Sequence, residues 1–252
     1  CIVVANAVRS DGTLSRSTSM LPGWDGVNLE SESNEIAPSP ILTETDANAG
    51  ALAERIWGAA REAEDFVYVE ASYGIGAGIM TGGQILYGTG GIAGEIGHIQ
   101  VPGHRKLCKC GGLGCLETIA SIRSIMTSLQ ELGMPVRTMN DLNRLLEDGD
   151  VRVTRQIQEA GRAMGYALSQ VCNILNPELI VIGGLFTMAG EVFLNQVREA
   201  VNQLAFPDSA SDMTLVLSSL GSSAPLRGAM AKAVNMADLD AILHRFLAEE
   251  VE

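Results

Sequence analysis

The sequence predicts a mixed α/β fold, with helices packed on the faces of a sheet. Short apolar runs typical of buried strands alternate with longer stretches of helical periodicity along the 252 residues. Apolar residues make up 46% of the chain and aromatic residues only 4%, so the core must consist of aliphatic side chains, alanine and methionine. A chain of this length can bury a large core and suggests one large domain or two smaller ones.

The first part of the chain combines a strand, a loop and a helix. Residues 1–5 are apolar and predict a strand, and because a buried strand needs partners we expect others upstream of it. Residues 6–40 are rich in Ser, Gly, Pro and Asn and predict an ordered loop anchored by Trp24. The Ala-rich stretch 46–57 predicts a helix, which Asp46 can cap.

The rest of the chain continues the alternation. Apolar runs predict strands at 66–72, 76–80, 84–87, 179–182 and 213–218. The second and third of these form a hairpin around a pair of glycines. Helical periodicity predicts helices at 116–131, 151–175 and 187–204, with two more after Pro225.

Charge and hydropathy exclude several classes of protein. The formal net charge is −13, which repels a phosphate backbone, so any contact with DNA would need another segment. The sequence has no run of eighteen apolar residues and no charged-then-apolar leader, which argues against a membrane span and against secretion. We therefore expect a cytoplasmic protein.

The most specific motif is a histidine followed by three closely spaced cysteines. His98, Cys108, Cys110 and Cys115 supply the four soft ligands of a tetrahedral zinc site. Because protein side chains would fill all four positions, such a site is normally structural. Glycines between the cysteines let the backbone bend tightly enough for the thiols to converge.

Two alternatives to this ligand set stay open. His104 could replace His98 as the fourth ligand, although it lies in a Pro-Gly turn rather than after an apolar segment. The cysteines could also be free or disulfide-bonded, but reduced thiols clustered with histidine usually bind a metal. Cys172 falls on the apolar face of a predicted helix and is expected to be a small buried side chain.

Two glycine motifs follow predicted strands. Gly74, Gly76 and Gly78 are spaced along a turn in which backbone N–H groups could cradle a phosphate, although a simple hairpin explains them equally well. Gly183 and Gly184 end a buried strand, the edge at which open α/β sheets place ligands. Each motif alone is weak.

Three carboxylates complete the candidate site. Asp46, Glu95 and Glu117 are acceptors that suit the vicinal hydroxyls of a polyol, and a carboxylate can also remove a proton from an attacking hydroxyl. Taken singly, Asp46 would be a helix cap and the two glutamates would be surface acids. Because Glu95 and Glu117 flank the candidate zinc segment, the three together predict a pocket for a sugar-like ligand.

These motifs resemble the ROK family of bacterial sugar kinases and sugar-responsive transcriptional repressors, in the actin-like ATPase superfamily. The resemblance rests on Gly-Glu-Ile-Gly-His at 94–98, the cysteine segment 108–117 and Asp-Ala-Asn-Ala at 46–49. The glycine motifs and Arg-Gly-Ala at 227–229 support it. It implies a two-lobed α/β fold (ribonuclease H-like) with a structural zinc loop, an incomplete N-terminal lobe and a sugar in the cleft between lobes.

The resemblance also implies a role for each matching residue. His98, Cys108, Cys110 and Cys115 match zinc ligands. The positions that match sugar contacts are Thr45, Asp46, Glu95, His98 and Glu117. Asp46 matches the general base of the family's kinases, and the five glycines match turns that face a nucleotide such as ATP, bound with Mg²⁺.

Departures from the family pattern favour the regulator branch. Thr45 stands where the kinases usually have Asn, and Tyr73 stands where a small hydroxyl residue is usual. The first phosphate loop of the family, of the type Asp-x-Gly-Gly-Thr, would lie upstream of Cys1. The segments 21–24 and 53–59 also look more like the repressors.

The sequence thus predicts the sugar-binding effector domain of a ROK-type regulator, which contacts DNA through an upstream segment and forms a homodimer or homotetramer. An ATP-dependent kinase for a hexose or N-acetylhexosamine is the alternative, and a zinc-stabilised interaction module without a ligand is a third possibility. We expect residues 1–47 to be a remnant of the N-terminal lobe and residues 48–235 to be the C-terminal lobe, with the zinc loop at 98–115. We expect residues 236–252 to be a helix that packs back on the N-terminal lobe.

Overall fold

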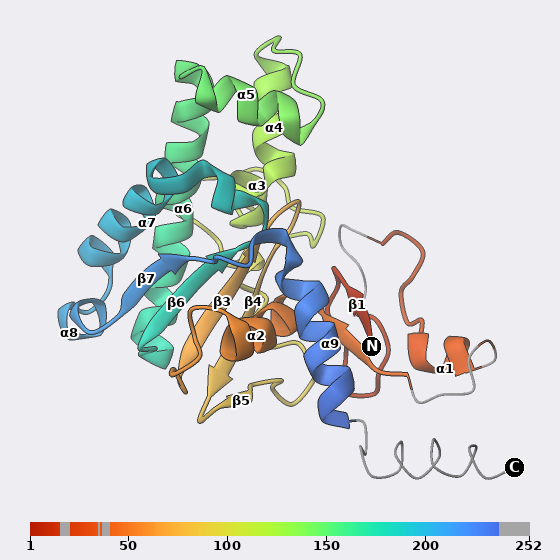
Figure 1. The fold of residues 1–252 in the computed structure, drawn as a ribbon. Coiled ribbons are helices and arrows are strands. Elements are labelled where there is room, and N and C mark those ends of the chain that lie inside the picture. Colours follow the sequence, from red (N-terminus) through yellow and green to blue (C-terminus); the bar gives the residue numbers. More distant parts are fainter. Residues whose placement is uncertain (16–20, 35, 37–40, 237–252) are drawn as a thin grey trace, which may run out of the picture.

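The computed structural model describes residues 1–15, 21–34, 36 and 41–236. Within them, a central sheet has the strand order β5-β4-β3-β6-β7 (Figure 1). Its parallel part comprises β3 (Phe66–Ala71), β6 (Leu179–Gly183) and β7 (Thr214–Leu217). The strands β4 (Ile75–Thr81) and β5 (Gln84–Ile85) extend it as an antiparallel meander. The predicted α/β fold and all the predicted strands of this sheet are confirmed.

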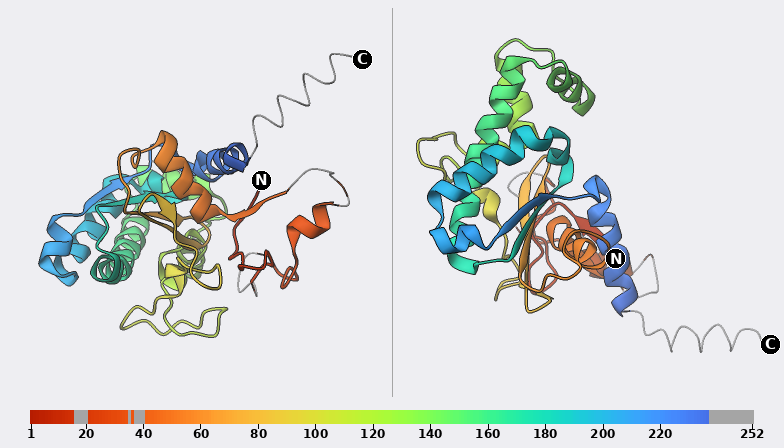
Figure 2. Two further views of the ribbon diagram at one scale, coloured as in Figure 1. Left: turned by 90° about the horizontal axis from the view of Figure 1, so that it is seen from below. Right: turned by 60° about the vertical axis from the view of Figure 1, so that its left-hand side comes forward.

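Helices cover both faces of the sheet (Figures 1 and 2). On one face lie α6 (Val151–Leu175) and α7 (Gly190–Leu204), against the Val67 and Val69 side chains of β3. On the other face lie α2 (Asp46–Trp57) and α9 (Ala224–Met236), against Phe66 and Tyr68. Side chains alternate between the faces of a strand, so β3 contributes to both cores and is fully buried.

A smaller parallel sheet pairs β1 (Ile2–Val4) with β2 (Thr43–Thr45). The loop region that contains α1 (Leu29–Asn34) lies between these two strands in the sequence. Val4, Leu14 and Leu29 form the small core of this part of the chain. The prediction that Trp24 anchors the loop is wrong, because this side chain is 42% exposed.

The remaining helical segments are short. They are α3 (Glu117–Ala120), α4 (Ile122–Glu131), α5 (Met139–Glu147) and α8 (Pro207–Ser211), with 3-10 turns η1 (Ile96–His98), η2 (Gly184–Ala189) and η3 (Gly221–Ser223). The single helix predicted at 116–131 is interrupted at Ser121, whose backbone is extended and whose side chain caps α4. The helix α5 was not predicted from the sequence.

Two further predictions concern the C-terminal segment and membrane-spanning helices. The predicted C-terminal helix at 236–252 lies outside the described residues beyond Met236. In the part of the chain that the structure describes, no helix combines the length and the apolar character needed to cross a bilayer.

A buried carboxylate connects the small sheet to the main body. Glu44 of β2 is 2% exposed and accepts hydrogen bonds from the Thr45 amide (2.9 Å), Asn48 of α2 (2.9 Å) and the Tyr87 hydroxyl (2.8 Å). The Lys232 ammonium of α9 lies 2.5 Å from the same carboxylate. Glu44 therefore holds β2, α2, α9 and the segment after β5 together, directly before Thr45 and Asp46.

Removing the positive partner of Glu44 should destabilise the fold. In Lys232→Met a buried carboxylate loses its counter-ion, and we expect the free energy of unfolding to fall by about 2–4 kcal/mol. In Glu44→Gln/Lys232→Met the amide keeps the shape of the carboxylate without its charge, so most of the loss should be recovered. Chemical denaturation of both variants measures this, and a double variant no more stable than Lys232→Met would contradict the assigned role of Glu44.

Candidate functional site

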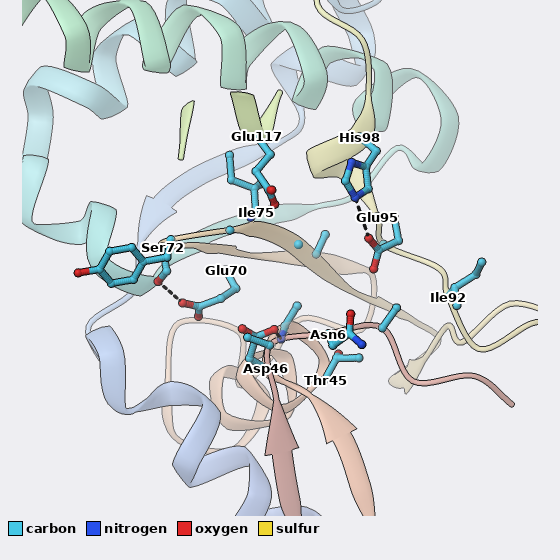
Figure 3. Close-up of a pocket in the computed structure, with 18 of the residues that line it drawn as sticks. Asn6, Thr45, Asp46, Glu70, Ser72, Ile75, Ile92, Glu95, His98 and Glu117 are labelled. Atoms are coloured by element: carbon cyan, nitrogen blue, oxygen red, sulfur yellow. Dashed lines mark hydrogen bonds and ion pairs between the residues drawn. The ribbon is translucent and has the colours of Figure 1, made fainter. Parts of the chain in front are cut away.

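A pocket of about 370 Å³ lies where the carboxyl ends of several strands meet (Figure 3). Asn6 follows β1, Thr45 and Asp46 join β2 to α2, and Glu70 lies at the end of β3. Glu95 and His98 line it from the loop around η1. In open α/β sheets this edge is where ligands bind, because the loops that follow the strands converge there.

The structure brings most of the predicted site residues into this one pocket. Its lining includes the predicted sugar contacts Thr45, Asp46, Glu95, His98 and Glu117, and the predicted nucleotide contacts Gly74 and Gly76. Gly78, Gly183 and Gly184 do not line it. The residues predicted to contact a sugar therefore lie together in this pocket, whereas only two of the five glycines predicted to contact a nucleotide line it.

Asp46 is the first residue of α2, but it does not cap this helix. The cap is Thr45, whose extended backbone lets its hydroxyl accept a hydrogen bond from the Asn48 amide (3.1 Å). The predicted capping role of Asp46 is therefore wrong. Its carboxylate accepts a hydrogen bond from the Ala47 amide (2.9 Å) and lines the pocket.

The surroundings of Asp46 favour its protonated form. Burial and the negative charge of Glu70 raise the pKa of Asp46 from 3.8 to about 7, although the Ala47 amide acts in the opposite direction. A carboxyl group with a pKa near neutrality can exchange a proton under physiological conditions. Asp46 is thus suited both to hydrogen bonding with hydroxyl groups and to general base chemistry.

The histidine and the three cysteines come together as predicted. The candidate ligand atoms of His98, Cys108, Cys110 and Cys115 all lie within 4.8 Å of one another. His98 Nδ1 lies 3.7 Å from Cys108 Sγ, and Cys110 Sγ lies 3.6 Å from Cys115 Sγ. The ligands of a tetrahedral zinc ion with 2.3 Å bonds would be about 3.8 Å apart, so the four residues could hold such an ion.

His104, the alternative fourth ligand, lies elsewhere. Its Nε2 atom is 3.4 Å from a carboxylate oxygen of Glu159 on α6, and it is not part of the cluster. This geometry favours His98 in the ligand set. All five cysteines lie within the described residues, and none of them is disulfide-bonded there.

The imidazole of His98 connects the cysteine cluster to the pocket. Its Nδ1 faces Cys108, while its Nε2 lies 3.6 Å from the Glu95 carboxylate. A metal-bound histidine commonly has its second nitrogen oriented by a carboxylate, which fixes the orientation of both groups. An ion in the cluster would therefore fix Glu95 as well.

Glu117 lies on the same side of the pocket as His98 and Glu95 (Figure 3). Its Oε2 accepts a hydrogen bond from the Ile75 amide, at 3.4 Å. The same oxygen would be 3.2 Å from a Cβ atom at Gly74, so the turn between β3 and β4 fits closely around this carboxylate. Glu117 begins α3 directly after Cys115 and Leu116, so the cysteine segment also positions it.

The other glycines have packing roles. Gly78 lies within β4, where a Cβ atom would be 2.4 Å from the Ala47 carbonyl oxygen of α2. A Cβ atom at Gly183 would collide with the Tyr68 ring. Gly184 has a φ of +72°, and its Cβ would be 2.4 Å from a Glu70 oxygen. Close packing explains these positions, and their contact with a nucleotide stays a prediction.

Glu70 is a pocket residue that no sequence motif predicted. This buried side chain accepts hydrogen bonds from the Tyr68 hydroxyl (2.7 Å) and the Ser72 hydroxyl (2.5 Å). Burial raises the pKa of the Glu70 carboxyl, while the hydrogen bonds from Ser72 and Tyr68 lower it. The available signal was a charged residue inside an otherwise apolar strand, which is rare unless the charge has partners.

Fold and site together define a class of protein. The architecture is that of the actin-like ATPases, as predicted, and its pocket carries several carboxylates beside a possible metal centre. The sequence profile of the ROK family matches residues 2–235, and the chain belongs to this family.

Relatives include both regulators and kinases. The xylose repressor of Caldicellulosiruptor bescii is 30% identical over 225 residues, covering 84% of this chain and 56% of the repressor. The glucokinase of Halalkalibacterium halodurans is 32% identical over 221 residues, covering 82% of this chain and 67% of the kinase. A crystal structure of a ROK family transcriptional regulator, a homologue of the E. coli MLC protein, has a TM-score of 0.77 and 30% identity. It covers 90% of this chain, which covers 59% of that one. The chain thus spans little more than half the length of these regulators.

The pKa of Asp46 predicts how stability depends on pH. The folded chain binds this proton more tightly than the unfolded chain, so the free energy of unfolding should fall as pH rises from about 4 to about 7. The variant Asp46→Asn has no titrating group at this position. Between pH 5 and pH 8 its free energy of unfolding should therefore fall by about 1 kcal/mol less than that of the wild type, which corresponds to about 2–4 °C in melting temperature. Thermal melts across this range measure the effect, with Glu131→Gln on the exposed end of α4 as the control. If the melting temperatures of wild type and Asp46→Asn change with pH in the same way, the assigned pKa of Asp46 is contradicted.

Proposed function

We propose that this chain is the sugar-binding effector domain of a ROK-type transcriptional regulator. The observation that carries the proposal is the convergence of Asp46, Glu95, His98 and Glu117 on one pocket. These groups come from segments far apart in the sequence, and their polar atoms suit a ligand with several hydroxyls.

A zinc ion held by His98, Cys108, Cys110 and Cys115 has a structural role in this proposal. With four protein ligands it has no open position for chemistry. It would hold the loop that carries Glu95 and Glu117, so that both carboxylates are preorganised for the sugar.

The regulatory step follows from the two-lobed fold. We propose residues 1–47 and 48–235 as the two lobes, with the sugar between them. A sugar that binds the closed arrangement better shifts the population toward it, and this shift changes how a homodimer or homotetramer presents its DNA-binding segments. The acidic chain requires a separate segment for that contact, and the partial coverage of the repressor supports this reading. A cytoplasmic location belongs to the same proposal.

An ATP-dependent sugar kinase is the second candidate. The raised pKa of Asp46 favours it, because a general base toward a sugar hydroxyl works best with a pKa near the working pH. The glucokinase relative supports the same reading. Against it, Thr45 provides no amide for the sugar, and Tyr73 places a half-exposed ring at the turn where ATP, with Mg²⁺, would have its phosphates.

The zinc proposal predicts the metal content and its link to the pocket. We expect one zinc ion per chain by elemental analysis, and little or none in Cys110→Ser. Cys1→Ser changes an exposed cysteine outside the cluster and should keep the metal. Because His98 joins the cluster to Glu95, Cys110→Ser should also weaken sugar binding at least tenfold, about 1.4 kcal/mol. Full zinc content in Cys110→Ser would overturn the ligand assignment.

Sugar binding itself is tested on the product of the complete gene. We expect calorimetry with xylose, glucose and N-acetylglucosamine to find at least one ligand. Glu95→Gln replaces a carboxylate acceptor by an amide and should weaken that ligand about tenfold, because a hydrogen bond to a charged group contributes about 1.5–3 kcal/mol. Glu131→Gln, on an exposed acid, should leave the affinity unchanged.

The same sugars distinguish the candidate functions. With ATP and Mg²⁺ present, we expect binding without phosphorylation of the sugar. Turnover that is lost in Asp46→Asn would establish the kinase instead. If no sugar binds or raises the melting temperature, the zinc-stabilised interaction module becomes the better interpretation.

A further inference from the structure

We propose that the pocket selects unphosphorylated sugars, and that Glu70 is the residue that excludes phosphoryl groups. This inference rests on the proposed sugar-binding function and names the class of ligand. It concerns the part of the pocket at the ends of β3 and β6, where Glu70 and Asp46 lie near each other (Figure 3).

The charge of the pocket opposes a phosphate. Four carboxylates line it, from Asp46, Glu70, Glu95 and Glu117. Among the described residues that line this pocket there is no lysine and no arginine. Phosphate groups carry about −1.5 to −2 charges at neutral pH, and protein sites normally balance them with such cations or with several N–H donors. The described lining provides a neutral polyol with acceptors, whereas a phosphate would meet several carboxylates and no lysine or arginine to balance its charge.

Glu70 stands where a phosphate would be expected in this kind of fold. In the sheet its register partners are Gly76 of β4 and Gly183 of β6. The ends of parallel strands next to glycine turns are the usual place for phosphates, because backbone N–H groups are accessible there. Here Gly184 and Ser72 fit closely around the Glu70 carboxylate, and hydroxyls of Tyr68 and Ser72 hold it in place.

Two backbone donors at this edge already have acceptors within the protein. The Ile75 amide, at the start of β4, donates to Glu117. The Leu185 amide, at the start of η2, donates to the Ser72 hydroxyl at 3.1 Å. A phosphate would have to displace these contacts as well as approach Glu70. Burial and the nearby charge of Glu70 both raise the pKa of Asp46, so a negative charge at this position is already unfavourable.

The test compares each sugar with its phosphate ester on the complete gene product. Calorimetry with glucose and glucose 6-phosphate, and with N-acetylglucosamine and its 6-phosphate, gives a ratio of affinities for each pair. We expect the free sugar to bind at least about tenfold more tightly, because like charges repel in a partly buried site. In Glu70→Gln this ratio should fall about tenfold or more, while Glu131→Gln, which loses the same charge on the surface, should keep the wild-type ratio.

Each outcome bears on a separate part of the inference. A phosphate ester that binds wild type as well as or better than its sugar overturns the selectivity, and this comparison needs no variant. If the wild type is selective but the ratio of affinities for sugar and phosphate ester is the same in a folded Glu70→Gln variant, the role of Glu70 is overturned. If neither sugars nor esters bind, the proposed function itself fails, and the inference fails with it.

Discussion

The imidazole of His98 is the group on which the site depends most. One nitrogen faces the thiols and the other faces the Glu95 carboxylate, so a single ring belongs to both the cysteine cluster and the pocket. Its position is set by η1, which lies between β5 and the cysteine segment in the sequence. The cysteine cluster and the ligand pocket are therefore structurally coupled. How well the loop is ordered determines how well the carboxylates that it positions are ordered.

The pocket combines acids with different surroundings. Asp46 is held at the start of a helix, Glu70 by two hydroxyls, Glu95 by an imidazole and Glu117 by the first amide of β4. Each carboxylate has its own support from a different element of the fold. This explains how several acids can share a pocket whose described lining includes no lysine or arginine, although burial and the charge of Glu70 still raise the pKa of Asp46.

Sequence patterns predicted most of the fold because the main elements carry strong local signals. The helix at 151–175 has a continuous apolar stripe and was confirmed with the same bounds. The interruption at Ser121 was missed because no glycine or proline marks it. By contrast, α5 had a readable signal, a capping box formed by Thr138 and Asp141. Trp24 lies in a segment without periodicity, where composition indicates a loop but gives no side-chain environment.

The candidate site was predictable to the extent that its residues are marked by motifs. The cysteine spacing indicated the cluster, and Glu95 and Glu117 were found because they flank it. Glu70 has no such motif and enters the pocket only through the pairing of β3 with β4 and β6, a non-local feature. The choice between Thr45 and Asp46 as the helix cap also depends on tertiary structure, since both residue types can cap.

The Glu44 contact has a consequence for dividing this chain into fragments. Its partners come from positions 45, 48, 87 and 232, so residues near both ends of the described chain meet at one carboxylate. A fragment that ends before α9 would keep the acid and lose its counter-ion, and a cut near residue 47 would separate the acid from most of its donors. The two lobes that we propose thus share one folding unit, and neither should be a stable domain when expressed alone.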